Sequence, residues 1–258
     1  MTMPRALSGA FLAAVLMIAA ACGSGSSDEA APRAPGGAPA DKRIDPSMAG
    51  SISGRVLFEG TPPAAAAIDM SSDSKCRVDG STPRDESVVV DDGGLENVFV
   101  YVKSGLGDYA FDTPTVPAKL SQEGCVYKPR VLGVRVGQPL QVENSDATTH
   151  NVHAAPSVNQ PLNTAQPFRG MTYTHSFSKP EIMVPFKCDI HSWMIAWVGV
   201  VEHPYFAVSS GGGRFELKTL PPGTYTIEAW HEKFGRQTAT VTLGPKESKE
   251  LSLTFKAS

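Results

Sequence analysis

A short segment near residue 190 carries side chains that bind soft and borderline metal ions. Cys188, His191 and Met194 follow one another with two residues between each pair, and His150 lies about forty residues upstream in "HNVH". A thiolate, imidazoles and a thioether are typical metal ligands in proteins. The four residues therefore form a candidate metal site, provided that the fold brings His150 to the other three.

The elements that carry these residues are predicted from their alternation. Cys188 ends the segment "IMVPFKC", whose period of two predicts a β-strand. One face of that strand would carry Ile182, Val184, Phe186 and Cys188. We expect the thiol to emerge from the buried side of a sheet, with His191 and Met194 curling back in the following loop. His150 would come from a different strand, so the site is a tertiary feature.

The same alternation runs through the chain from Ser51 onward. It recurs in "ENVFVYVK", "GVRVGQPLQVEN", "MTYTHSF", "GRFELKTL", "TYTIEAW" and "KELSLTF", and Gly, Pro, Asn and Asp separate these segments. No segment shows a sustained helical stripe. We therefore predict an all-β fold made of one β-sandwich or a pair of them.

Three segments within residues 105–202 resemble the cupredoxins, the family of plastocyanin and azurin. They are "YKPRVLGVRVGQPLQVENSDATTHNVH", "EIMVPFKC" and "CDIHSWM", in family order. The resemblance implies a Greek-key sandwich that binds one copper ion through His150, Cys188, His191 and Met194. It also implies that Asn151 ties the two ligand loops together by hydrogen bonds. Two imidazoles, a thiolate and a long thioether contact suit both oxidation states of copper.

The ligand loop departs from plastocyanin in one place. That family more often has four residues between the second histidine and the methionine, and here there are two. "HSWM" resembles the H-S-x-M of the dinuclear copper centre of cytochrome oxidase, which needs a second cysteine in the loop. Only Cys188 is present, so a mononuclear site is implied. Met194 is the implied axial ligand, with Met183 and Met171 as alternatives.

Residues 51–104 and 203–256 resemble the two halves of another β-sandwich, the carboxypeptidase regulatory-like or transthyretin-like module. "SGRVLFEGTPP" and "LENVFVYV" fit its first half, and the Gly-bearing turn followed by "RFELKTLPPGTYTIEAW" fits its second. This resemblance implies a small discontinuous sandwich with the cupredoxin-like domain, 105–202, inserted between its halves. A simple tandem arrangement is the alternative.

The N-terminus reads as an export signal. Arg5 precedes the apolar run "FLAAVLMIAA", which is too short to span a bilayer. Residues 1–22 end in "AAAC", which resembles the lipobox of bacterial lipoproteins and predicts lipidation of Cys22, although "AAA" also suits ordinary signal peptidase. Residues 23–50 are rich in Gly, Ser, Ala and Pro, and we expect them to form a disordered tether.

The chain has four cysteines. An exported chain can keep disulfides, and pairing Cys76 with Cys125 would leave Cys188 unpaired for metal binding. In the alternative, Cys188 belongs to a disulfide and one of the other two is free.

The other histidines are expected not to bind the metal. His153 lies three positions after His150, so a strand would point the two to opposite faces. His175 shares a face with aromatic residues, and His203 and His231 lie in the other sandwich. Trp193 and Trp197 would either shield the metal from water or pack in a core. Zinc is disfavoured because methionine is a poor zinc ligand.

These features predict a function and exclude others. The net charge of -3 gives no electrostatic attraction to nucleic acid. We expect a one-electron carrier of the periplasm or cell surface, attached to the membrane by lipid only, which exchanges electrons with a redox partner protein through an exposed edge of His191. The alternative is a copper-binding module for storage, delivery or sensing. No catalytic motif indicates an enzyme.

Overall fold

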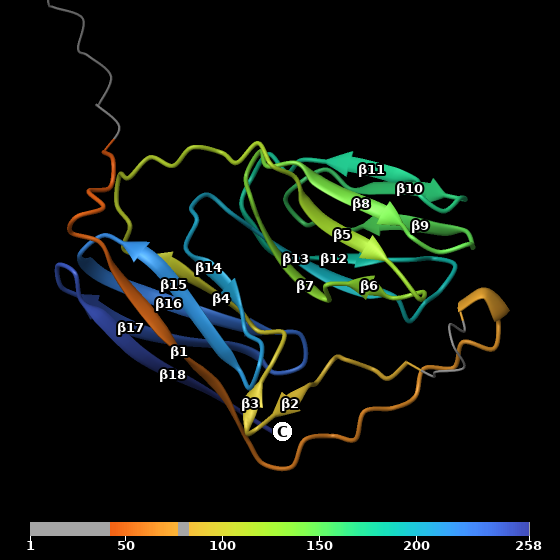
Figure 1. Cartoon of the computed structure of the whole chain (residues 1–258), viewed down its shortest axis with the longest axis horizontal. Coiled ribbons are helices and arrows are strands. Elements are labelled where there is room, and N and C mark those ends of the chain that lie inside the picture. Colours follow the sequence, from red (N-terminus) through yellow and green to blue (C-terminus); the bar gives the residue numbers. More distant parts are fainter. Residues whose placement is uncertain (1–41, 77–82, 258) are drawn as a thin grey trace, which may run out of the picture. The chain divides into compact units, whose positions relative to one another are not determined.

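The computed structural model describes residues 42–76 and 83–257, shown in colour in Figure 1. Eighteen strands make up nearly all of their regular structure, and the one helical element in these two ranges is the single 3-10 turn η1 (Ser74–Cys76). The prediction of an all-β fold is confirmed. Across the same residues, no helix has the length and apolar character needed to cross a membrane.

The first sandwich is assembled from both ends of the described chain. One of its sheets contains β1 (Gly50–Glu59), β2 (Val90–Asp91), β3 (Gly94–Leu95), β15 (Arg214–Leu220) and β18 (Ser248–Lys256). The other contains β4 (Phe99–Ser104), β14 (Phe206–Val208), β16 (Gly223–His231) and β17 (Gly235–Leu243). β1 pairs in parallel with β18 and antiparallel with β15, while β4 lies between β14 and β16. Neither sheet is complete without strands from both ends.

The second sandwich is formed by the residues between those two halves. One sheet has the order β10 (Leu162–Gln166), β9 (His150–Ala154), β12 (Glu181–Lys187), β13 (Ile195–Val201) and β7 (Val131–Arg135). The other has the order β11 (Thr172–His175), β8 (Leu140–Asn144), β5 (Ala118–Gln122) and β6 (Tyr127–Lys128). Their facing side chains form one buried cluster that contains Val152, Val184, Phe186, Cys188 and Met194. Two of the candidate ligands, Cys188 and Met194, thus belong to this core.

Strand β4 is buried on both faces. Val100 and Val102, with Val98 just before the strand, point into the core of the first sandwich, as their alternation predicts. Phe99 and Tyr101 point the other way and pack in a separate cluster with residues of β7, β12 and β13. The Phe99 ring lies directly against the backbone of β13. A Cβ on Gly199 of that strand would be only 2.6 Å from Phe99 Cζ.

Two details differ from the sequence predictions. Met183 has a positive φ of 67° and lies where the register between β12 and β13 shifts. This irregularity breaks the alternation, so Ile182 packs with the cluster around Phe99 instead of sharing a face with Val184. Residues 42–49 are also not part of a tether, since Ile44 packs against the first sandwich and the Ala110 N–H bonds to the Lys42 carbonyl. Residues 23–41 lie outside the described residues.

A segment between β1 and β2 leaves the first sandwich and reaches the second (Figure 1). We call residues 68–76 the strap. Its Met70 and Cys76 are buried in the core cluster of the second sandwich, and Ile68 packs against that cluster. The strap therefore connects one sandwich to the core of the other through a long excursion of the chain.

His203 and His231 lie in the first sandwich, where each makes a hydrogen bond to a backbone group. The Val102 carbonyl accepts from His203 Nε2, and His231 Nδ1 accepts from the Lys233 N–H. Burial, with Arg130 and Lys233 nearby, lowers the pKa of His231 to about 4. The folded protein therefore holds this imidazole neutral.

This burial predicts an acid dependence of stability. Below pH 6.5 the unfolded chain binds a proton at His231 that the folded chain does not take up until about pH 4. Stability is therefore lost as the pH falls through this window. Because one pKa unit corresponds to about 1.4 kcal/mol, His231→Asn should remove roughly 3 kcal/mol of that loss in urea unfolding followed by circular dichroism. His153→Asn is the control, since its side chain is 38% exposed and lies in the other sandwich. Equal pH dependence in His231→Asn and the unaltered protein would contradict this account.

Candidate metal centre

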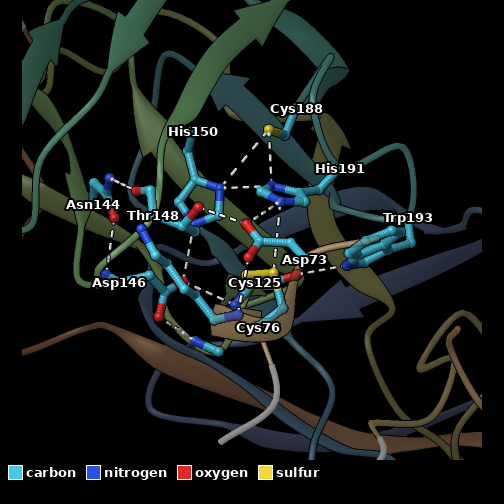
Figure 2. The surroundings of a disulfide bond; sticks show 12 residues. Asp73, Cys76, Cys125, Asn144, Asp146, Thr148, His150, Cys188, His191 and Trp193 are labelled. Atoms are coloured by element: carbon cyan, nitrogen blue, oxygen red, sulfur yellow. Dashed lines mark hydrogen bonds and ion pairs between the residues drawn. A yellow bond between two sulfur atoms is a disulfide. The ribbon is translucent and has the colours of Figure 1, made fainter. Parts of the chain in front are cut away.

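Three ligand atoms converge at one end of the second sandwich (Figure 2). Nδ1 of His150 lies 3.0 Å from Nδ1 of His191, and the Cys188 sulfur lies 3.9 Å and 3.8 Å from these two nitrogens. A point equidistant from all three atoms lies about 2.1 Å from each. Bonds from nitrogen and thiolate ligands to a metal such as zinc are about 2.0 to 2.3 Å long. The triangle therefore has the size of a three-ligand metal site.

His150 is held by a carboxylate on the side away from the triangle. Its Nε2 lies 2.9 Å from Oδ2 of Asp146, and the imidazole is fully buried. A carboxylate accepts hydrogen bonds, so Nε2 carries a proton and Nδ1 is the nitrogen that faces Cys188. This arrangement is typical of metal-binding histidines.

His191 is held in the same way by a residue of the strap. Its Nε2 lies 3.2 Å from Oδ2 of Asp73 and 3.6 Å from the sulfur of Cys76. The residue is only 1% exposed. The prediction that His191 presents an exposed imidazole edge is therefore wrong, because the strap covers that edge.

The electrostatics of the triangle favour a cation. Burial opposes protonation of His150, but the hydrogen bonds to Asp146 and Cys188 outweigh it and raise its pKa to about 9. Burial also opposes ionisation of Cys188, yet hydrogen bonds from His150 and from backbone groups lower the pKa of its thiol. For His191, burial and the neighbouring His150 lower the pKa, which favours the neutral imidazole. The Cys188 thiolate and the neutral His191 are forms that bind metal, whereas His150 keeps a proton beside the thiolate that a bound metal ion would displace.

Asn151 ties the two ligand segments together. Its Oδ1 accepts a 2.6 Å hydrogen bond from the Asp189 N–H, directly after Cys188. Its Nδ2 donates to the side chains of Asn163 and Asp189, at 2.8 Å each. Asn151 therefore fixes the loop after β12 to β9, the arrangement that the sequence resemblance implies.

A second polar network braces the loop before His150. Asn144 is buried and donates to the carbonyls of Thr148 and Gln166, while its Oδ1 accepts from the Asp146 N–H. Asp146 in turn accepts from the N–H groups of Gly124 and Cys125. The carboxylate that orients His150 is thus fixed at several points.

The disulfide lies directly beside this network (Figure 2). Cys76 and Cys125 are bonded, and among the cysteines of the described residues Cys188 is free and buried. Trp193 also borders the site, with its ring 5.2 Å from that of His191 and its Nε1 donating to the Cys125 carbonyl. Trp197 packs instead with Trp230, in the cluster around Phe99.

Met194 is fully buried in the same cluster as Cys188, and the loop between them is closed by backbone hydrogen bonds. Its role as an axial ligand stays a prediction. Met183, one alternative, packs in the cluster around Phe99 instead. Met171 is half-buried after the β10–β11 turn. Cys22 lies outside the described residues.

The sequence reasoning did not identify the two carboxylates. Asp146 lies in the loop "NSDATTH", four residues before His150, which is a weak signal for a local contact. Asp73 is separated from His191 by 118 residues, and its only sequence signal is its place three residues before Cys76. Its contact with His191 depends on where the strap packs against the second sandwich.

No protein-family model matches the chain, and no curated protein matches it either. Among solved structures, a copper-containing nitrite reductase from Thermus scotoductus is 25% identical, with 36% of this chain and 24% of that chain covered at a TM-score of 0.29. A purple cupredoxin from Nitrosopumilus maritimus is 20% identical over 32% of this chain and 98% of its own, at 0.28. An amicyanin variant is 21% identical over 39% and 97%, at 0.31. These neighbours are two cupredoxins and a copper enzyme.

The hydrogen bonds of Asn151 predict its importance for stability. Asn151→Ala leaves the Asp189 N–H without its acceptor, which should lower the free energy of unfolding by about 1 to 3 kcal/mol. Urea unfolding of the two proteins measures the difference. Asn163→Ala is the matched control, because it retains that acceptor and should cost clearly less. Equal losses in the two variants would show that Asn151 does not fix the loop.

Proposed function

We propose that this protein binds one copper ion through His150, His191 and Cys188, with Met194 as a weak axial ligand, and carries single electrons. The observation that carries the proposal is the triangle of Nδ1, Nδ1 and Sγ atoms with a common centre about 2.1 Å away. Two imidazoles and a thiolate in a trigonal plane are the ligand set of blue-copper sites.

The surroundings favour copper over zinc. Zinc sites in proteins are usually tetrahedral and need a fourth nitrogen, oxygen or thiolate ligand. The two carboxylates at the site, Asp73 and Asp146, contact the far nitrogens of the imidazoles and not the triangle. Met194, a thioether, is the remaining donor expected from the loop, and thioethers suit copper.

The frame around the triangle supports a carrier. When bound, copper would supply a single electron that is gained or lost without any bond being made in a substrate. His150 and His191 are each fixed by a carboxylate, and Asn151 fixes the loop after Cys188. Such a frame keeps the ligands in place in both oxidation states. A delivery protein needs ligands that release metal, and the closed site with His191 1% exposed argues against easy release.

Export, a lipid anchor at Cys22 and a redox partner protein are parts of the same proposal. The bonded pair Cys76 and Cys125 supports an oxidising compartment such as the periplasm or cell surface. Each of the three His, Cys and acidic clusters found among the described residues contains His150 or His191, so the clusters overlap at one place. This overlap supports a single metal centre.

The ligand set predicts a specific spectrum. The purified protein loaded with Cu(II) should show an intense visible thiolate-to-copper absorption at a stoichiometry of one ion per chain. Cys188→Ser should remove that band, because the thiolate is its origin. Ser192→Ala, an exposed position in the same loop, should retain it.

Two results would contradict the proposal. One is a copper-loaded protein without the band, and the other is a band that survives Cys188→Ser. Reversible reduction and oxidation without loss of metal is expected of the carrier, whereas transfer of copper to an acceptor in each cycle would favour delivery.

A further inference from the structure

The far edge of His191 is covered by the strap, a segment that belongs by sequence to the first sandwich. Asp73 contacts Nε2 of His191 and is itself fixed by a 2.6 Å hydrogen bond from Thr148. Its side chain is 22% exposed, while that of His191 is 2% exposed. The carboxylate therefore lies at the surface of the site with one oxygen turned inward to the imidazole.

The strap is fastened to the second sandwich on both sides of Asp73. Met70 is buried in the core, 3% exposed, and Cys76 is bonded to Cys125. The Cys125 N–H donates in turn to Asp146, the carboxylate that orients His150. Figure 2 shows the strap, the disulfide and both imidazoles as one contiguous group.

We propose that Asp73 is a positioning residue of the metal centre, delivered across the protein by the disulfide-fastened strap. It holds the proton of His191 on Nε2, so that Nδ1 faces the metal, and it places a negative charge beside the metal. This inference rests on the proposed function. It gives each imidazole its own carboxylate, Asp146 from the loop before His150 and Asp73 from the strap.

The negative charge of Asp73 should shift the reduction potential of the metal in one direction. A carboxylate near the metal stabilises the ion of higher charge more than the ion of lower charge, and it does so strongly where water is excluded. Asp73 should therefore favour Cu(II) over Cu(I) and lower the reduction potential. For one charge acting across an imidazole in a partly buried site, we expect an effect on the order of tenfold in the ratio of the two affinities.

If Asp73 only stabilised the fold of the strap, its charge would not affect the reduction potential. Its Oδ1 accepts a 2.9 Å hydrogen bond from the Lys75 N–H, which caps the turn η1. Asparagine can make the same cap through Oδ1, but it carries no charge and places an amide NH2 where Asp73 Oδ2 accepts from Thr148 and His191. Asp73→Asn therefore keeps the cap of the strap while it removes the charge and the acceptor of His191 Nε2.

The first experiment measures the reduction potential of the copper protein by spectroelectrochemical titration. Asp73→Asn should raise the potential by about 59 mV, the equivalent of a tenfold change for one electron. Asp73→Glu restores the charge and should return the potential toward the original value. Asp108→Asn removes an exposed charge after β4 and should leave it unchanged. Equal potentials in Asp73→Asn and the original protein would overturn the proposal.

The role of the strap is tested by a double-mutant cycle. Cys76→Ala/Cys125→Ala should raise the potential as Asp73→Asn does, because the carboxylate is no longer held. Adding Asp73→Asn to that background should then change little. Full additivity of the two effects would show that the disulfide does not deliver Asp73.

A measurement on protein prepared without metal separates this inference from the proposed function. Long-range proton–nitrogen NMR correlations should place the His191 proton on Nε2 in the original protein and in Asp73→Glu. Asp73→Ala should lose that preference. An unchanged tautomer in Asp73→Ala would overturn the positioning role, whereas a missing copper–thiolate band with the expected tautomers would overturn the proposed function alone.

Discussion

Two imidazole nitrogens held 3.0 Å apart beside a thiolate need a positive charge between them, either a proton on His150 or a metal ion. The rest of the structure around the site can be understood as the frame that maintains this arrangement. Each imidazole is fixed from behind by a carboxylate, at 2.9 Å for His150 and 3.2 Å for His191. Because these carboxylates hold the far protons, the near nitrogens are left free to bind.

The two sandwiches contribute to this frame differently. The second sandwich supplies the ligands from β9 and from the loop between β12 and β13, and Asn151 joins the two segments. Between β1 and β2, two strands of the same sheet, the chain leaves the first sandwich and forms the strap. The disulfide at the end of the strap then links Asp73 to the loop that holds Asp146. The result is a buried site in which the imidazole edge of His191 is not open to solvent.

Periodic strands and residues close together in the chain could be predicted from the sequence. Contacts between residues far apart in the chain could not. Alternation in β8, β15 and β16 predicts an all-β fold because burial on one face imposes a period of two. Cys188 and His191 are only three residues apart, so their convergence is a local matter. The bulge at Met183 carries no such pattern, since it arises from how β12 meets its neighbour. The contact of Asp73 with His191 could not be predicted either, because nothing near His191 in the sequence indicates which loop covers this residue.

The most direct test of the metal centre is the X-ray absorption fine structure of the copper-loaded protein. The triangle predicts a first shell with two nitrogen donors and one sulfur donor about 2.1 Å from a single copper. A first shell of nitrogen and oxygen alone, without a short copper–sulfur distance, would contradict the assignment of Cys188, His150 and His191 as the ligands.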